Sequence, residues 1–247
     1  MANFLKEQSF GELIRNTFRI YGRYFIPIVL TYLILVYPWQ FLYSMGFHEQ
    51  NTVFMVIGVV LVMASSLFAM AIVTLLISDV CVGNKISLAR YFKRAFGTIL
   101  GKLLLTNLLQ TIIIAIGFIL LVIPGLVFMV WFLFAGSIVV LEEKWGVQAL
   151  KRSRILGKGY YLRNFGVFFV LLIVVIMISA VIGFIVGILG ATVIDTGIGG
   201  LGLLMFQDLV QVVTTPIWTI SFILMYYDLR VRKEAYNNDV LAEELRR

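Results

Sequence analysis

The chain has 247 residues, of which 61% are hydrophobic and only 13% are charged. An ordinary soluble domain carries about 25% charged residues, so this composition excludes that class and predicts a protein of the lipid bilayer. The net charge of +7 does not predict nucleic-acid binding, because the cations flank apolar stretches. The lone Cys81 excludes an intramolecular disulfide and a cysteine metal cluster.

Six apolar stretches are long enough, or nearly long enough, to cross a hydrocarbon core as helices. In chain order they are Ile26–Tyr43, Val53–Ile77, Leu103–Ile123, Leu126–Leu141, Val167–Leu189 and Leu203–Tyr227. The first contains Pro27 and Pro38, and the fourth is so short that the Ile123–Leu126 turn would lie inside the membrane. We therefore expect an all-α, polytopic membrane protein with six transmembrane helices.

All 20 Lys and Arg residues fall in four segments: before the first span, between spans two and three, between spans four and five, and after span six. The other three connections, residues 44–51, the turn at residues 123–125 and residues 190–200, contain none. Positive charge favours the cytoplasmic side. The partition predicts a multi-pass protein of the cytoplasmic membrane with both termini in the cytoplasm.

Three of the basic segments share a pattern, in the letters ELIRNTF (12–18), RYFKRAF (90–96) and QALKRSR (148–154). Apolar residues recur at helical spacing from Phe10 and again from Leu88, which predicts amphipathic helices. Ser9 with Glu12 forms a capping-box pattern, and Ser87 is a plausible N-cap. Each such helix, an elbow, precedes a pair of spans.

The chain is thus expected to be one membrane domain, 1–247, built from three elbow-plus-hairpin units. These are unit 1 (9–80), unit 2 (86–142) and unit 3 (145–228), followed by a cytoplasmic tail (229–247). Cations on the elbows would contact anionic lipid headgroups, at about 1 kcal/mol each near the surface. The candidates are Arg15, Arg19, Lys93, Arg94, Lys151 and Arg152.

The third elbow carries small residues where the other two carry Phe and Leu. Its face consists of Gly146, Ala149, Leu150, Ser153 and Gly157. Small residues gain little from lipid but let another helix approach closely. This face is expected to dock on protein, either within this chain or on a partner.

Polar residues inside spans are functional candidates by default. Asp208, Gln211 and Thr215 share one face of span six, and Asn107 and Gln110 lie in span three. They form either a structural hydrogen-bond cluster joining the two spans or a site for a solute, an ion or a lipid headgroup. The depth of Asp208 stays open, because it lies about 12 Å from Gly200 but about 30 Å from Asp228 along a helix.

Catalysis is not predicted, and neither is a cofactor or a metal. The only histidine, His48, stands beside Glu49 in an outer connection, and this pair makes neither a metal site nor a catalytic triad. Glu142 and Glu143 are adjacent, but we expect them to pair with neighbouring cations.

Two stretches carry a family resemblance. The letters IPGL (123–126) followed by LEEKWGVQALKRSRILGKG (141–159), and the ending YYDLRVRKE (226–234), resemble the glycerophosphoryl diester phosphodiesterase membrane-domain family and its YciC-like relatives. The resemblance implies a bacterial or archaeal integral membrane protein. It implies no settled activity, since the family's catalytic domain has no counterpart here.

Two functions from different classes follow. The first is a non-catalytic membrane scaffold or accessory subunit that binds anionic lipid and a protein partner. The alternative is a transporter or lipid-handling protein that uses the polar residues of spans three and six. A membrane phosphodiesterase is a more distant third.

Overall fold

The computed structural model describes residues 5–191, 199–234 and 236–246, and within these ranges every regular element is a helix. The expected outer connection at residues 190–200 falls largely outside them. The helices are α1 (Phe10–Arg23), α2 (Phe25–Leu35), α3 (Tyr37–His48), α4 (Thr52–Val82), α5 (Leu88–Arg94), the π-helical turn η1 (Ala95–Ile99), α6 (Leu100–Leu120), α7 (Val122–Trp131), α8 (Ala135–Glu142), α9 (Val147–Gly157), α10 (Tyr161–Ala191), α11 (Gly199–Glu234) and α12 (Asn238–Arg246).

Five helical stretches of the described chain are long and apolar enough to cross a membrane. They are Thr52–Val82, Leu88–Leu120, Val122–Glu142, Tyr161–Ile185 and Gly202–Glu234. A sixth results if α1 and α2, which meet at an angle of 76°, count as one broken span. The all-helical class is therefore confirmed for the described residues, and their five to six long apolar helical stretches fit a multi-pass membrane protein.

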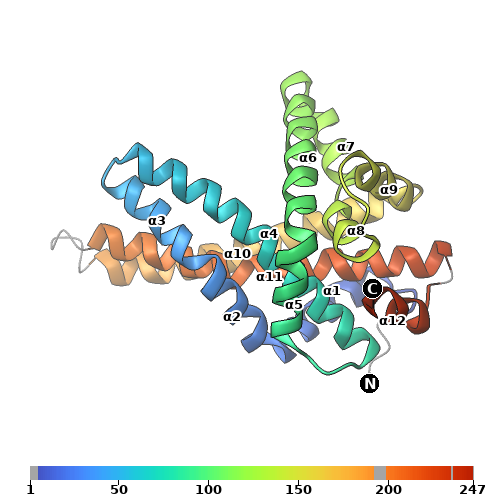
Figure 1. The fold of residues 1–247 in the computed structure, drawn as a ribbon. Helices are drawn as coiled ribbons and strands as arrows, with labels where there is room; N and C mark the ends of the chain where they lie inside the picture. The colour runs from blue at the N-terminus through green and yellow to red at the C-terminus, as the bar shows by residue number, and fades with distance from the viewer. Residues whose placement is uncertain (1–4, 192–198, 235, 247) are drawn as a thin grey trace.

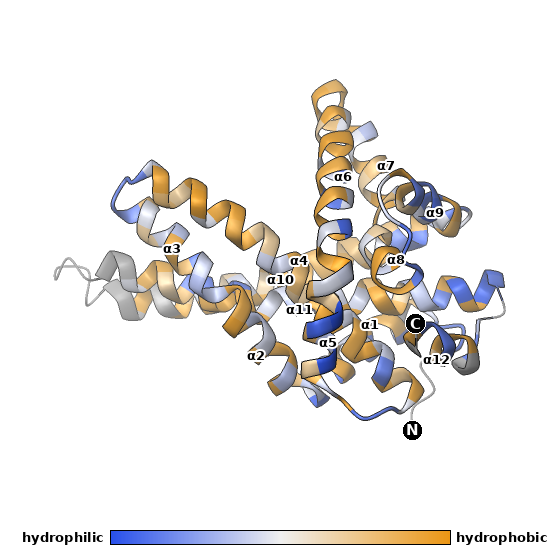
Figure 2. Ribbon diagram, viewed as in Figure 1, coloured by the Kyte–Doolittle hydropathy of each residue, from blue (hydrophilic) through white to orange (hydrophobic). Residues whose placement is uncertain are grey.

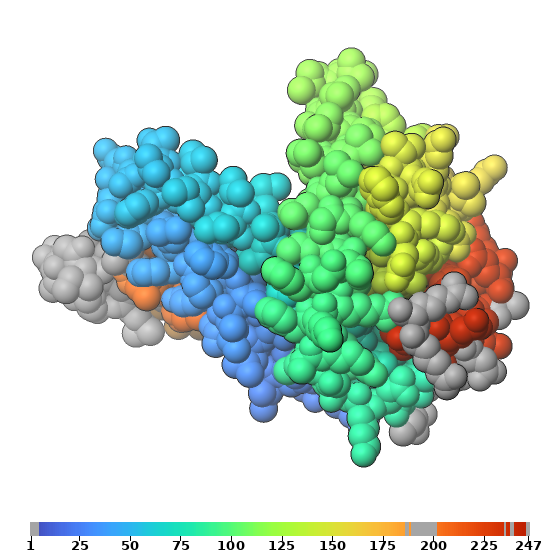
Figure 3. Space-filling view, in the orientation of Figure 1, coloured from blue at the N-terminus to red at the C-terminus, as the bar shows by residue number. Residues whose placement is uncertain are grey.

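The helices form two arms that diverge from a common base (Figure 1). The first arm contains α3 and α4 beside parts of α10 and α11, which continue into the base, and the second arm is the α6–α7 hairpin (Figure 1). The space-filling view shows the surface hollowed between the arms (Figure 3). Hydrophilic residues gather around α5, α9, α12 and the end of α11, away from the arm tips, with a smaller polar group at the α3–α4 loop (Figure 2). We call the larger group the basic end.

The first predicted span is not one helix. The helix is interrupted at Val36, between α2 and α3. Pro38 has no N–H to donate to the preceding turn, and its ring would clash with a carbonyl of that turn. The α3 half packs tightly on α4. A Cβ placed on Gly58 would lie 2.7 Å from the Tyr43 Cα, so this approach requires glycine.

The second elbow is not a separate surface helix either. Leu88–Leu120 runs as one long helix in which η1 replaces the expected bend. Tyr91, Ala95 and Ile99, spaced four apart on the predicted apolar face, are buried in the protein, whereas Phe92 and Phe96 of the same face are exposed. A π-helical turn absorbs an extra residue without breaking the helix, so the three predicted units are not alike.

The first and third elbows do form separate helices. Ser9 and Glu12 make the predicted capping box at the start of α1, whereas Ser87 precedes α5 without a side-chain capping bond. The turn between α6 and α7 is a single extended residue, Leu121, so the predicted turn at Ile123–Leu126 was wrong in position. Pro124 is accommodated in the first turn of α7, where its missing N–H is not needed.

The small-residue face of the third elbow is buried within the chain. Ala149, Leu150, Ser153 and Gly157 of α9 are all buried. The Ser153 hydroxyl donates to the Trp131 carbonyl at 2.7 Å and accepts from the Phe134 N–H at 3.2 Å, across the break between α7 and α8. This face therefore docks on its own chain, which is the first of the two alternatives that the sequence left open, and it is not available as a partner face.

Gly146 begins the same helix in a conformation with φ +57° and ψ −135°, which side-chain-bearing residues rarely adopt. Its N–H donates to the Thr106 hydroxyl at 2.8 Å, which ties the start of α9 to α6. Gly146 thus serves as the capping position of α9 and, like the rest of that face, belongs to an internal contact.

Candidate functional site

The five predicted intramembrane residues are divided between two places. Asp208 accepts a hydrogen bond from Ser44 of α3 at 2.7 Å, and Gln211 accepts one from the side-chain amide of Gln40, one turn earlier on α3. Asp208 is buried. The predicted cluster between spans three and six is therefore wrong for these two residues, whose partners lie on α3.

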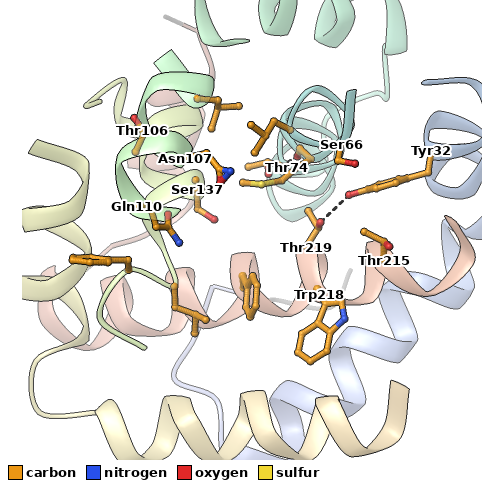
Figure 4. A pocket seen from close by; sticks show the side chains of 17 residues that line it. Tyr32, Ser66, Thr74, Thr106, Asn107, Gln110, Ser137, Thr215, Trp218 and Thr219 are labelled. Carbon is orange, nitrogen blue, oxygen red and sulfur yellow. Dashed lines mark hydrogen bonds between the residues drawn. The ribbon is translucent and has the colours of Figure 1, made fainter. Parts of the chain in front are cut away.

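The other three, Asn107, Gln110 and Thr215, line a cavity of about 250 Å³ where the two arms meet (Figure 4). Four helices, α4, α6, α8 and α11, supply most of its wall, and α2 adds Tyr32. The polar side chains in the wall are Tyr32, Ser66, Thr74, Thr106, Asn107, Gln110, Ser137, Thr215, Trp218 and Thr219. We call this cavity the junction pocket.

Half of these polar groups are already bonded inside the protein. Tyr32 and Thr219 share a hydrogen bond of 2.9 Å between their hydroxyls, drawn as a dashed line in Figure 4. The hydroxyls of Thr74, Thr106 and Thr215 donate to carbonyls one turn earlier on their own helices, at 2.7–2.8 Å. These bonds fix the shape of the wall and use most of the hydroxyl protons, so these groups are left mainly as acceptors.

The remaining groups differ. Within the described part of the chain, the side chains of Asn107, Gln110, Ser66 and Ser137 form no hydrogen bond, and Figure 4 shows them around the pocket. A side-chain amide offers two donors and an acceptor. In apolar surroundings such a group is costly unless it is satisfied. The junction pocket is thus equipped to hydrogen-bond a guest.

A second cavity, of about 580 Å³, lies between α10 and α11. Ser179 and Gly183 contribute from α10, and Gln207, Gln211 and Thr214 from α11. Only two helices form it, and large apolar residues of α10, such as Phe169 and Phe184, remain exposed. It is a larger but less enclosed groove than the junction pocket.

The predicted headgroup contacts also divide into two classes. Arg15, Arg19, Lys93 and Lys151 have exposed side chains. Arg94 and Arg152, by contrast, are used inside the protein. Arg94 donates to the Leu245 carbonyl at 2.9 Å, so these two residues are poor candidates for lipid contacts.

Arg152 joins α9 to two other helices at the basic end. Its guanidinium donates to Glu142 of α8 at 2.9 Å and pairs with Glu234 of α11 at 2.6 Å. Burial lowers the pKa of Arg152, but the hydrogen bonds to Glu234 and Glu142 outweigh it and raise the pKa above its ordinary value. The guanidinium therefore stays charged. Glu142 pairs with neighbouring cations, as predicted.

The same network continues into the C-terminal helix. Arg230 donates to Glu234 at 2.9 Å and to both carboxylate oxygens of Glu244 at 2.9 and 3.0 Å, and it lies 3.8 Å over the Tyr236 ring. Burial, followed by the hydrogen bond to Glu244, raises the pKa of Tyr236. The acidic groups of α8, α11 and α12 are thus linked through two arginines.

A second network of ion pairs and hydrogen bonds at the basic end centres on Asp228, whose side chain is fully buried. It accepts from the Gln8 N–H at 2.6 Å, from Arg163 at 2.5 Å and from Arg232 at 3.1 Å. Both arginines also donate to the Gln8 carbonyl. Residues of the YYDLRVRKE ending therefore fasten the N-terminal segment to α10 and α11.

Several pocket residues were missed from the sequence. Ser137, Ser66 and Thr219 are single small polar residues in apolar runs and gave no distinguishing pattern. Gln40 and Ser44 could have been found, because they stand four apart on one helical face. No group of three or more His, Cys, Asp or Glu residues in the described ranges is arranged to hold a metal ion.

The resemblance noted in the sequence and the geometry of the junction pocket both invite comparison with known proteins. Comparison of the chain with protein-family models, with curated proteins and with solved structures found no match.

Proposed function

We propose that this chain is a non-catalytic integral membrane protein that handles lipid, holding the polar part of a membrane lipid in the junction pocket. One observation carries the proposal. The side-chain amides of Asn107 and Gln110, unbonded within the described chain, line a half-open cavity whose exposed wall is mostly apolar in area. Such a mixture suits an amphiphile, since ligand pockets combine apolar walls with a few placed polar groups.

The position of the pocket supports the same proposal. It lies where the arms meet, and the surface between the arms is hollowed (Figure 3). Toward the tip of the first arm, the pocket-lining face of α4 continues at helical spacing through Met63, Val60 and Val56, all exposed. This row offers an apolar surface against which acyl chains could lie.

The scaffold function has less support. Its main basis was the small-residue face of the third elbow, and this chain itself covers that face. Its other basis, the basic elbows, is compatible with either function. We propose that Arg15, Arg19, Lys93 and Lys151 contact anionic headgroups, each contributing about 1 kcal/mol near the surface.

The proposed location is the cytoplasmic membrane of a bacterium or archaeon, with the basic end toward the cytoplasm. The support is the partition of the cations in the sequence. At the same end, Arg163 and Arg152 form ion pairs with α11, and Arg94 donates to the Leu245 carbonyl. In this orientation the arm tips and the hollow between them would face the outer leaflet.

The proposal is tested by extracting the protein with its surrounding lipid in polymer discs and recording native mass spectra. We expect about one retained lipid per chain, which Gln110→Trp should displace by filling the pocket. The matched control is Thr111→Trp, because Thr111 is exposed and does not line the pocket. Equal lipid retention in both variants would contradict the proposal, and a stoichiometric second protein without lipid would favour the scaffold.

A further inference from the structure

The charge of the junction pocket restricts what it can hold. None of its 17 described lining residues is Asp, Glu, Lys, Arg or His. A phosphate group placed there would lose its hydrating water and would find no cation to pair with. Burying an unpaired charge in an apolar medium is very costly. Uncharged hydrogen-bonding groups carry no such cost when they are satisfied.

The nearest cation on a lining helix is directed elsewhere. Lys102 stands one turn before Thr106 on α6, but its ammonium pairs with Glu143 at 3.9 Å, at the basic end. The Thr106 hydroxyl donates to the Lys102 carbonyl and accepts from the Gly146 N–H. A headgroup phosphate in the pocket would therefore have no charged partner among the described lining residues.

The groups left for bonding match a neutral headgroup. The amides of Asn107 and Gln110 each supply donors and an acceptor, and the hydroxyls of Ser66 and Ser137 can do both. Donors fit ester carbonyls, and acceptors fit a free hydroxyl. The cavity of about 250 Å³ equals the liquid volume of roughly eight waters, at about 30 Å³ each. That space suits a glycerol unit with its ester groups.

We infer that the ligand of the junction pocket is an uncharged glycerolipid of the diacylglycerol type, rather than a phospholipid. This inference rests on the proposed function and narrows it to one chemical class. The Asn107 and Gln110 amides bind the free hydroxyl and the ester carbonyls. The acyl chains leave the pocket along the exposed apolar face of α4.

The experiment uses two photoreactive lipids with identical acyl chains, one a diacylglycerol and the other a phosphatidylglycerol. Each is added to the full-length protein in nanodiscs, and the crosslinked peptides are mapped by mass spectrometry. We expect the diacylglycerol probe to label the lining segments of α4, α6 and α11, and unlabelled diacylglycerol to compete. The double variant Asn107→Leu/Gln110→Leu should lower this labelling roughly tenfold or more, since two hydrogen-bonding groups are lost.

The matched control is Thr111→Val, which removes a polar group from α6 outside the pocket and should leave labelling unchanged. If the double variant fails to fold, competition by unlabelled diacylglycerol on the unmodified protein still tests whether the pocket binds this lipid. Pocket labelling by the phosphatidylglycerol probe that diacylglycerol cannot displace would overturn the inference but leave the proposed function standing. Labelling of the pocket by neither probe would overturn both.

Discussion

Replacing Asp228 by asparagine should strongly destabilise the basic end. The carboxylate is fully buried and faces two guanidinium groups, Arg163 at 2.5 Å and Arg232 at 3.1 Å. Removing one partner of a fully buried ion pair costs about 3–5 kcal/mol, because the other charge is left uncompensated. Asparagine keeps an oxygen that can accept from the Gln8 N–H, so the loss falls mainly on the two arginines.

Both arginines keep some exposure, 21% and 20% of their side-chain surface, so solvent moderates the loss. We therefore expect about 2–3 kcal/mol. For a chain of this length, 1 kcal/mol corresponds to about 2–4 °C of unfolding midpoint. The predicted fall is then roughly 4–12 °C, measured in nanodiscs at one fixed scan rate because unfolding of such proteins is seldom reversible.

The matched control is Glu7→Gln. Glu7 pairs with the same Arg232 at 2.9 Å, but its side chain is 62% exposed. An exposed pair contributes about 0–1 kcal/mol, so the midpoint should move by no more than a few degrees. Asp228→Asn should also speed tryptic cleavage after Lys6, because the segment at Gln8 loses its anchor. Equal midpoints for the two variants would refute the reasoning.

Three further predictions concern local structure. Ser153→Ala should lower stability by about 1–3 kcal/mol, because it leaves two backbone groups at the α7–α8 break unbonded; an unchanged unfolding midpoint would exclude this role. Gly58→Ala should cost about 1–3 kcal/mol through overpacking against α3, whereas Gly101→Ala, with open space around it, should be neutral or stabilising; equal effects would contradict the close approach. The Ser9 N–H, followed by Lys6, lowers the pKa of Glu12 from 4.5 to about 2, so its support of α1 should be complete above about pH 4.5 and lost as the pH falls toward 2; amide exchange in the first turn of α1 would show this, and Glu12→Gln should abolish the dependence.

The features that the sequence predicted well are those set by local pattern. Hydropathy located the long apolar helices because each must satisfy its backbone within itself in a bilayer. The Ser9–Glu12 capping box depends on residues three apart and formed as predicted. The small residues of α9 predicted close packing on protein, and they pack closely. In each case the information lies within one helical element.

The features that the sequence did not predict depend on how helices are rotated against each other. Asp208 and Gln211 were assigned to a cluster with span three, but they face Ser44 and Gln40 of α3. The residue pairs run in opposite directions along the two helices, as antiparallel packing requires. The sequence does show a pair of polar residues one turn apart in each helix, Gln40 with Ser44 and Asp208 with Gln211, and each pair marks a polar helix face. Which of several such faces meet is decided by tertiary packing, which single-helix periodicity does not contain.

The bend expected between the second elbow and span three is absent from the structure for a related reason. A repeated pattern of elbow residues favours a repeated shape, but no proline follows α5, and Ala95 after it keeps α-helical dihedral angles (φ −64°, ψ −42°). Without a stop signal the helix continues through η1 into α6. Pro38 shows the opposite case, since a single proline broke a span that hydropathy alone would treat as continuous.

The base and the tips of the molecule are built differently, and this bears on how a lipid would reach the junction pocket. At the basic end, Arg152 and Arg230 link the carboxylates of α8, α11 and α12, and the α12 backbone accepts from Arg94 of α5. Both arms are therefore cross-linked at their base by charge-assisted hydrogen bonds, the stronger class of such bonds. The helix that carries the pocket-facing amides, α6, is tied to this base through the Gly146 N–H on Thr106. The backbone at the pocket is therefore placed before any ligand arrives, which reduces the ordering cost of binding. Toward the tips the arms diverge and expose apolar side chains. In the proposed function, a lipid would enter from between the tips and stop where the ion pairs close the base.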